Sequence, residues 1–179
     1  MNLYIMRHGT TVWNEKGITQ GQTNNKLSKK GIELTNEAAL QYKNVDIDII
    51  YCSPLMRTIQ TANIMNKFHN VKIIRDHRLI EIDQGIFTGR SKHDLTEEEK
   101  KLKFSRAESC NMESYQSVYD RVKEFITEIK NNKFDNALII THNCNATFLE
   151  DILLEEDIDF NNDKHLRNFK NAEVKLFKC

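Results

Sequence analysis

Two arginines and two histidines stand out in this chain because each follows a short apolar stretch that is typical of a β-strand. Guanidinium groups bind the oxygens of phosphates and carboxylates through paired hydrogen bonds. An imidazole can serve as a nucleophile or carry a proton. Taken singly, such residues are most often an inert loop histidine or a salt-bridging arginine, so their joint placement is what matters. The four residues are Arg7, His8, Arg57 and His142.

The elements that must position these side chains follow from the hydrophobic pattern. Short apolar stretches alternate with longer amphipathic ones, which predicts an α/β fold with a mostly parallel sheet covered by helices on both faces. Ligands of such sheets bind outside the carboxyl ends of the strands, where these arginines and histidines would meet. The expected strands span 2–6, 45–52, 71–74, 137–141 and 171–177.

Residues that favour a helix start precede most of the predicted helices. Pro54 predicts the first turn of a helix that opens at residues 53–54, and another helix is expected over about 145–154. Hydroxyl side chains are good N-caps, and a glutamate three residues later completes a capping box. The expected N-caps are Ser28, for a helix to about residue 44, Thr96, with Glu99 at capping-box spacing, and Ser114.

Two guanidinium groups and two imidazoles at one sheet edge predict a strong anion site. A phosphoryl group suits it, because its oxygens match the arginine fork. An adjacent imidazole could attack phosphorus and form a phosphohistidine, which divides one displacement into two easier ones. The leaving oxygen then needs an acid, and Glu81 and Asp83 are both candidates in the loop after the 71–74 strand. Cys144, near His142, is a less favoured thiol nucleophile.

Several segments resemble the motifs of one known family, the histidine phosphatase superfamily of phosphoglycerate mutase-like proteins. Residues 7–10 (RHGT) resemble its RHG signature, and residues 11–14 (TVWN) continue it. Residues 53–62 (SPLMRTIQTA) read almost letter for letter as its SPLxRAxQTA motif. The other matching segments are 20–31, 79–85, Glu113–Ser114 with Arg121, and Thr141–His142, in the expected order from the first residues to about Leu154.

This resemblance implies a three-layer α/β/α sandwich with a mostly parallel central sheet and a role for each matching residue. His8 is expected to be the nucleophile and Glu81 the general acid. Arg7, Arg57 and His142 are expected to hold the phosphoryl oxygens. The resemblance also places Asn14, Gly21 and Asn143 among the substrate-binding residues.

Several positions depart from the family pattern, and one of them lies directly beside His142. Asn143 stands where the family usually has glycine beside its second histidine. Asparagine adopts positive φ angles more readily than most residues, so we expect the turn to persist. No metal and no cofactor is expected, because the arginines and imidazoles supply the positive charge and no carboxylate or thiolate ligand set accompanies the two histidines.

Composition excludes several classes of function. The 179 residues include 26 Lys and Arg against 26 Asp and Glu, so the chain lacks the overall charge of a nucleic-acid or membrane-surface binder. No apolar stretch approaches the roughly 20 residues that span a bilayer. Met1 leads directly into a predicted strand without room for a signal peptide, and the widely spaced cysteines fit free thiols, so we expect a cytoplasmic protein.

The sequence favours a metal-independent phosphatase that acts on a small phosphorylated metabolite. We expect one domain over 1–179, with a cap over about 86–112 that selects the substrate. A cofactor-dependent phosphoglycerate mutase is the alternative, but the basic residues after the acid motif are interpreted as scattered among acids: Arg90, Lys92, Lys101, Lys103 and Arg106. A non-catalytic phosphate-binding domain is less favoured, because His8, Glu81 and both arginines are kept. The oligomeric state is left open.

Overall fold

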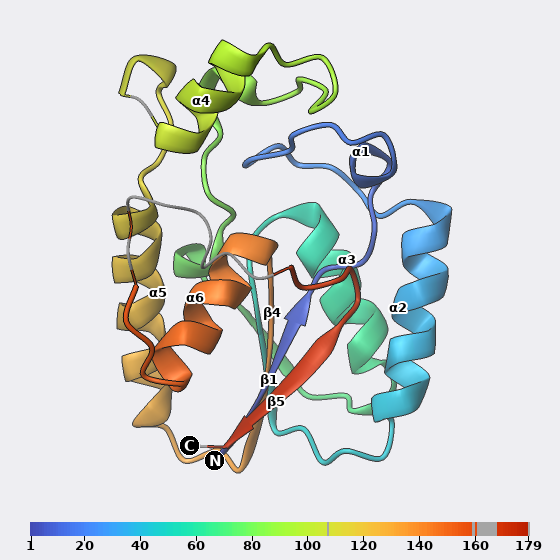
Figure 1. Cartoon of the computed structure of the whole chain (residues 1–179). Helices are drawn as coiled ribbons and strands as arrows, with labels where there is room; N and C mark the ends of the chain where they lie inside the picture. The colour runs from blue at the N-terminus through green and yellow to red at the C-terminus, as the bar shows by residue number, and fades with distance from the viewer. Residues whose placement is uncertain (107, 159, 161–167, 179) are drawn as a thin grey trace.

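A twisted sheet runs through the centre of the computed structural model (Figure 1). The structure describes residues 1–106, 108–158, 160 and 168–178, and within them the sheet has five strands in the order β3-β2-β4-β1-β5. The first four strands in the chain are parallel, and β5 runs antiparallel to β1. The strands are β1 (Asn2–Arg7), β2 (Ile49–Cys52), β3 (Lys72–Arg75), β4 (Asn136–Thr141) and β5 (Val174–Lys178).

Helices cover both faces of this sheet, which makes the three-layer α/β/α arrangement that the sequence predicts. Helices α2 and α3 lie on one face and α5 and α6 on the other, while α4 stands apart above the sheet edge (Figure 1). The α-helices are α1 (Val12–Glu15), α2 (Lys29–Tyr42), α3 (Met56–Met65), α4 (Glu97–Ser105), α5 (Tyr115–Lys130) and α6 (Asn143–Leu153). Short 3₁₀ turns are η1 (Asn66–Phe68), η2 (His77–Leu79), η3 (Gly85–Phe87) and η4 (Glu108–Cys110).

The strand residues alternate between two apolar cores, as the pleat of a sheet requires. Ile5, Tyr51 and Ile139 pack with α5 and α6. Their sequence neighbours Met6, Ile50 and Ile140 pack with α2 and α3 on the opposite face. Because both faces are buried, β2 and β4 have almost no polar side chains.

The predicted N-caps are confirmed. The Ser28, Thr96 and Ser114 hydroxyls each accept a hydrogen bond from the backbone N–H three residues later. The Glu99 carboxylate accepts from the Thr96 N–H and completes the capping box. Pro54 is a correction, because α3 starts at Met56 with Leu55 as its N-cap, so the proline lies before the first turn and not within it.

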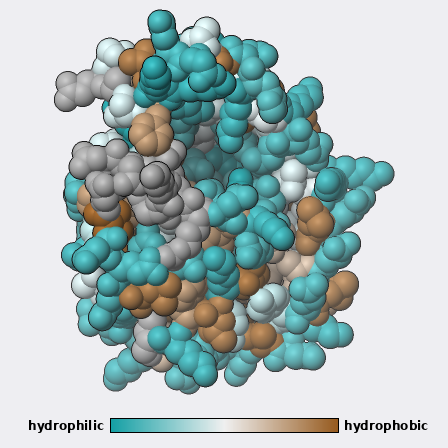
Figure 2. Space-filling model, viewed as in Figure 1, coloured by the Kyte–Doolittle hydropathy of each residue, from teal (hydrophilic) through white to brown (hydrophobic). Residues whose placement is uncertain are grey.

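The carboxyl ends of β1, β2 and β4 lie at the same edge of the sheet, as parallel register requires. Hydrophilic side chains surround a recess between this edge and α4 (Figure 2). Among the described residues, no helix is both long enough and apolar enough to cross a membrane.

Candidate active site

His8 lies at the end of β1 and is almost fully buried. Its Nδ1 is 2.6 Å from the Gly9 carbonyl oxygen, which can only accept, so Nδ1 has the proton. Burial, reinforced by the charges of Arg57 and Arg7, holds the pKa of His8 well below its usual value. The ring is therefore neutral, and its Nε2 has the free lone pair that a nucleophile needs.

His142 lies against His8, with the ring centroids 5.2 Å apart. Its Nδ1 is 3.3 Å from Arg57 Nε, which can only donate. Burial and the Arg57 charge also hold the pKa of His142 well below its usual value. A neutral ring then has its proton on Nε2, which is 2.8 Å from Ser53 Oγ. Both ring nitrogens thus have protein partners.

Arg57, in the first turn of α3, is fully buried. Besides the bond to His142, its guanidinium donates to the carbonyl oxygens of Gly21 and Thr23 at 2.9 and 2.7 Å. Burial lowers the pKa of Arg57 to about 10, so the group is charged at neutral pH. Its charge contributes to the positive potential at His8.

Arg7, the last residue of β1, is half-buried and lines the cavity beside His8. Nη1 donates to the Phe169 carbonyl. Nε is buried and has no hydrogen-bond partner within the described part of the chain. An unsatisfied buried donor next to a nucleophile is costly unless a ligand oxygen accepts from it.

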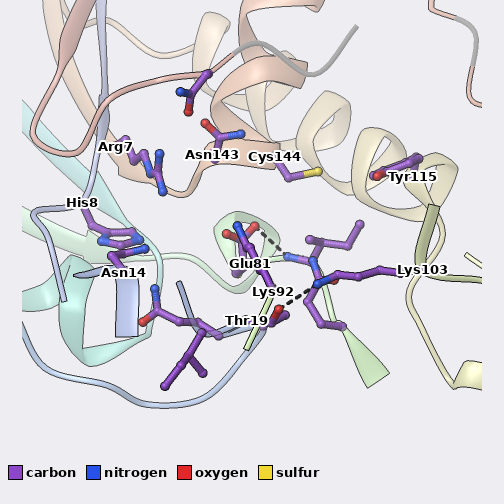
Figure 3. Close-up of a pocket in the computed structure, with 16 residues that line it drawn as sticks. Arg7, His8, Asn14, Thr19, Glu81, Lys92, Lys103, Tyr115, Asn143 and Cys144 are labelled. Atoms are coloured by element: carbon purple, nitrogen blue, oxygen red, sulfur yellow. Dashed lines mark hydrogen bonds between the residues drawn. The ribbon is translucent and has the colours of Figure 1, made fainter. Parts of the chain in front are cut away.

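Asn14 belongs to α1, a short helix that is absent from the predicted elements. The Thr11 N–H donates to Asn14 Oδ1 at 3.1 Å, and the Asn14 N–H donates back to Thr11 Oγ1. Because a backbone N–H can only donate, this capping box fixes which end of the amide is oxygen. Asn14 lines the cavity next to His8 (Figure 3), so its Nδ2 is available as a further donor.

Glu81 and Asp83 were both candidate acids, and the structure separates them. Glu81 lines the cavity, and burial raises its pKa against the opposing charges of Arg57 and Arg7. Asp83 Oδ1 instead accepts from the Gly85 N–H at 2.8 Å, and Asp83 does not line the cavity. Glu81 is therefore the carboxyl that can meet a bound ester.

Arg121 holds the segment that carries Glu81. Its guanidinium forms paired hydrogen bonds with the Glu113 carboxylate at 3.0 and 3.2 Å and also donates to the Arg78 carbonyl. Glu113 Oε2 in turn accepts from the Asp83 N–H at 3.1 Å. The ion pair thus makes hydrogen bonds to the backbone on both sides of Glu81, at Arg78 and Asp83. Arg121 is therefore a structural residue.

The residue that replaces the family glycine, Asn143, does not have a positive φ angle. It is the first residue of α6, directly after the N-cap His142, and its Oδ1 accepts from the Phe169 N–H at 3.0 Å. The expectation of a left-handed turn was wrong, because the helix starts at once. Asn143 and Cys144 line the cavity at the positive end of α6. Burial raises the pKa of the Cys144 thiol well above its usual value, which argues against a thiolate nucleophile.

These residues surround a cavity of about 270 Å³. Arg7, His8 and Asn14 lie at one end and Lys103 and Tyr115 at the other (Figure 3). Arg57 and His142 do not line it, although the His142 ring contacts the His8 ring and Arg57 contacts His142. Gly21, with φ of +48°, lines the wall and gives its carbonyl to Arg57. The remaining lining residues are Ile18, Thr19, Gln20, Glu81, Ile82, Gln84, Lys92, Asn143, Cys144 and Asn168.

The sequence analysis missed the basic residues of the cap. It interpreted them as scattered among acids, yet Lys92 and Lys103 both line the cavity. Arg90 and Lys100 do pair with acids, Glu99 and Glu97. Distance along the chain hid this grouping, because only the fold of residues 86–112 shows which lysines turn inward.

The described residues contain no group of three or more histidine, cysteine, aspartate or glutamate side chains that could hold a metal ion. The positive charge near His8 comes from Arg7, Arg57 and the start of α6, and Lys92 and Lys103 add positive charge at the other end of the cavity.

Comparison with known proteins identifies the family. A model of the histidine phosphatase superfamily (branch 1) matches residues 3–178. The chain belongs to this superfamily. It is 30% identical over 151 residues to phosphoserine phosphatase 1 of Hydrogenobacter thermophilus. The alignment covers 78% of this chain and 69% of that protein.

Solved structures of histidine phosphatase superfamily relatives have the same fold. The phosphoglycerate mutase of Bacillus anthracis is 25% identical, with a TM-score of 0.79 and coverage of 98% of this chain and 86% of its own. The alpha-ribazole phosphatase of Shigella flexneri is also 25% identical, with a TM-score of 0.77 and coverage of 88% and 81%. The relatives thus include phosphatases and a mutase that act on small phosphorylated substrates.

Proposed function

We propose that this protein is a metal-independent phosphatase that hydrolyses a small phosphomonoester through a phosphohistidine on His8. His8 Nε2 attacks phosphorus in line with the ester oxygen, so the N–P bond forms as the P–O bond breaks. The Gly9 carbonyl accepts the hydrogen bond from His8 Nδ1–H, so the proton stays on Nδ1, Nε2 stays unprotonated and the ring orientation is fixed. This nucleophilic ring beside the unsatisfied Arg7 Nε is the single observation that carries the proposal.

Positive groups around His8 stabilise the transferring phosphoryl group. Arg7 donates to its oxygens directly, and Asn14 adds a neutral donor. Arg57 and His142 do not line the cavity, so the Arg57 charge acts through the positive potential at His8, and the His142 ring packs against His8. Gly21 and Asn143 complete the wall. Positive groups that are already in position where negative charge develops in the transition state are the main source of catalysis in phosphoryl transfer.

Glu81 supplies and then removes a proton. In the first step its carboxyl protonates the leaving alkoxide, so the alcohol departs neutral. In the second step the Glu81 carboxylate takes a proton from water, whose oxygen attacks the phosphohistidine and releases inorganic phosphate. Burial, which raises the pKa of Glu81, favours the protonated form that the first step requires.

The test is hydrolysis of p-nitrophenyl phosphate in EDTA. We expect the wild-type protein to be active without added metal and His8→Ala to lose about 10³-fold or more in kcat. His93→Ala is the matched control, because His93 is an exposed histidine outside the cavity. Phosphoenzyme trapped by acid-free quenching should be stable in base, labile in acid and absent from His8→Ala. Activity that needs magnesium, or that survives this substitution, would overturn the proposal.

A phosphoglycerate mutase is the second candidate, and one observation favours it: two cap lysines line the same cavity as His8. A mutase must hold a substrate that has a second anionic group and return the phosphoryl group to it. Incubation with 3-phosphoglycerate and a bisphosphate primer distinguishes the two activities. Formation of 2-phosphoglycerate faster than inorganic phosphate would establish the mutase.

A further inference from the structure

The end of the cavity far from His8 is built by the cap. Lys92 precedes α4 and Lys103 lies within it, and both line the cavity that contains His8 and Glu81. Figure 3 shows the Lys103 side chain reaching from α4 toward Thr19, whose hydroxyl accepts from Nζ at 2.7 Å. A second hollow under the cap shares Gln84, Lys92, Lys103 and Tyr115 with the first.

These lysines lack a compensating acid. Within the described part of the chain, neither Lys92 nor Lys103 forms an ion pair, whereas Arg90 and Lys100 on the same segment do. Arg106 lines the second hollow and lies over the Tyr115 ring. Its hydrogen bonds go to the neutral carbonyls of Asp83 and Glu113, so they do not cancel its charge. The cap thus concentrates positive charge over a cavity.

Lys103 experiences that excess directly. Burial, together with the nearby charges of Lys92, Arg106 and Arg90, lowers its pKa to about 8. Its Nζ also contacts the Thr19 hydroxyl and lies 5.6 Å from the centroid of the Phe87 ring, and neither group carries a charge. An anion bound here would relieve the mutual repulsion of these cations.

An unsatisfied acceptor adds an independent sign of a ligand. Gln84 Oε1 is buried and has no hydrogen-bond partner among the described residues, and Gln84 lines both hollows. A hydroxyl or ammonium group of a ligand would satisfy it. The far end of the cavity therefore offers cations together with one acceptor.

We propose that Lys92 and Lys103 bind a second anionic group of the substrate. This rests on the proposed function, because the first anionic group is the phosphoryl group at His8. The substrate class is a small phosphomonoester that has a carboxylate or a second phosphate a few atoms from the ester oxygen. A cavity of about 270 Å³ that joins both ends suits a compact molecule with two anionic ends.

A matched pair of substrates tests this. 3-Phosphoglycerate and glycerol 3-phosphate share a skeleton and differ in a carboxylate against a hydroxymethyl group. We expect wild-type kcat/KM to favour 3-phosphoglycerate by about 10-fold to 100-fold, as a charge-assisted hydrogen bond implies. Lys103→Met and Lys92→Met should each reduce this ratio to near one, with most of the change in KM. Lys103→Arg should restore part of it.

Lys101→Met is the control, because Lys101 is an exposed lysine of α4 outside both hollows, and it should leave the ratio unchanged. A wild-type ratio near one, or equal losses on both substrates in Lys103→Met, would overturn the inference. A phosphatase that shows His8-dependent hydrolysis without this selectivity would keep the proposed function and lose the inference. An inactive wild type would defeat the function itself.

Comparing 1,3-propanediol bisphosphate with the monophosphate distinguishes a second phosphate from a carboxylate as the preferred group. A larger lysine-dependent preference in this pair than in the glycerate pair identifies a bisphosphate. The reverse order identifies a phosphorylated acid.

Discussion

At the scale of single residues, Glu81 must carry a proton at the pH at which a phosphate ester is a dianion. Burial raises its pKa, while Arg57, the Ile82 N–H and Arg7 oppose that rise. The protonated acid is needed for the first step, so kcat should fall as pH rises through the pKa of Glu81 in the complex. Binding of a dianion nearby moves this pKa further up.

We predict that Glu81→Gln lowers kcat by about 10²-fold to 10⁴-fold on an alkyl phosphate, the usual contribution of general acid catalysis. The loss should be much smaller on p-nitrophenyl phosphate, whose leaving group departs without a proton. Steady-state kinetics with both substrates checks this, and Asp83→Asn is the control, because Asp83 does not line the cavity. Equal losses on the two substrates would show that Glu81 is not the acid.

Single residues were also where sequence and structure differed most. The RHGT and SPLMRT segments predict His8, Arg7 and Arg57 as site residues, and the structure places His8 and Arg7 in the cavity wall. The engagement of both His142 nitrogens by Arg57 and Ser53 depends on side-chain geometry that a motif does not specify. The inward direction of Lys103 depends in the same way on how the cap folds.

At the scale of elements, close backbone contacts hold the His8 loop in place. Gly31 of α2 packs on this loop so tightly that a Cβ atom there would lie 1.9 Å from the Thr10 carbonyl oxygen. On the other side, the Gly9 N–H donates to Thr61 Oγ1 of α3 at 3.0 Å. The two helices thus fix the direction in which His8 leaves β1.

We predict that Gly31→Ala lowers the free energy of unfolding by about 1–3 kcal/mol, because the added methyl group must displace backbone. It should also reduce kcat more than 10-fold, since small shifts of a nucleophile are costly. Chemical denaturation and steady-state kinetics measure the two effects. Lys30→Ala, at the adjacent exposed position, should change neither, and a fully active Gly31→Ala would show that the contact does not position His8.

The helices and strands themselves were largely predictable. The hydroxyl N-caps Ser28, Thr96 and Ser114 each accept a hydrogen bond from a backbone N–H three residues later. Because this contact is local in sequence, it could be predicted without the tertiary structure. The short helix α1 has too few residues for an apolar period, and only the Thr11–Asn14 capping box could have indicated it. β2 begins at Ile49 and not at residue 45, because strand ends depend on the partner strand β4.

At the scale of the whole molecule, a net charge of zero leaves substrate capture to the local field. The same positive environment has a cost for folding. Burial and the arginine charges keep the pKa values of His8 and His142 well below those of an unfolded chain. Below about pH 6.5 the two histidines are protonated in the unfolded chain but stay neutral in the native protein. The free energy of unfolding is therefore highest above that pH and decreases as pH falls.

We therefore predict that the free energy of unfolding decreases as pH falls from about 7 to 5.5, by up to about 1.4 kcal/mol per pH unit for each of the two histidines. The raised pKa of Glu81 acts in the opposite direction, because the native state then binds its proton first, but one carboxyl offsets only one histidine. Denaturation at several pH values gives the slope. His142→Gln should reduce this slope by up to about 1.4 kcal/mol per pH unit, the contribution of one proton. His93→Gln, at an exposed position, should leave the slope unchanged. A slope that His142→Gln leaves unchanged would mean that the histidine pair does not resist protonation, and the neutral nucleophile at His8 would lose its physical basis.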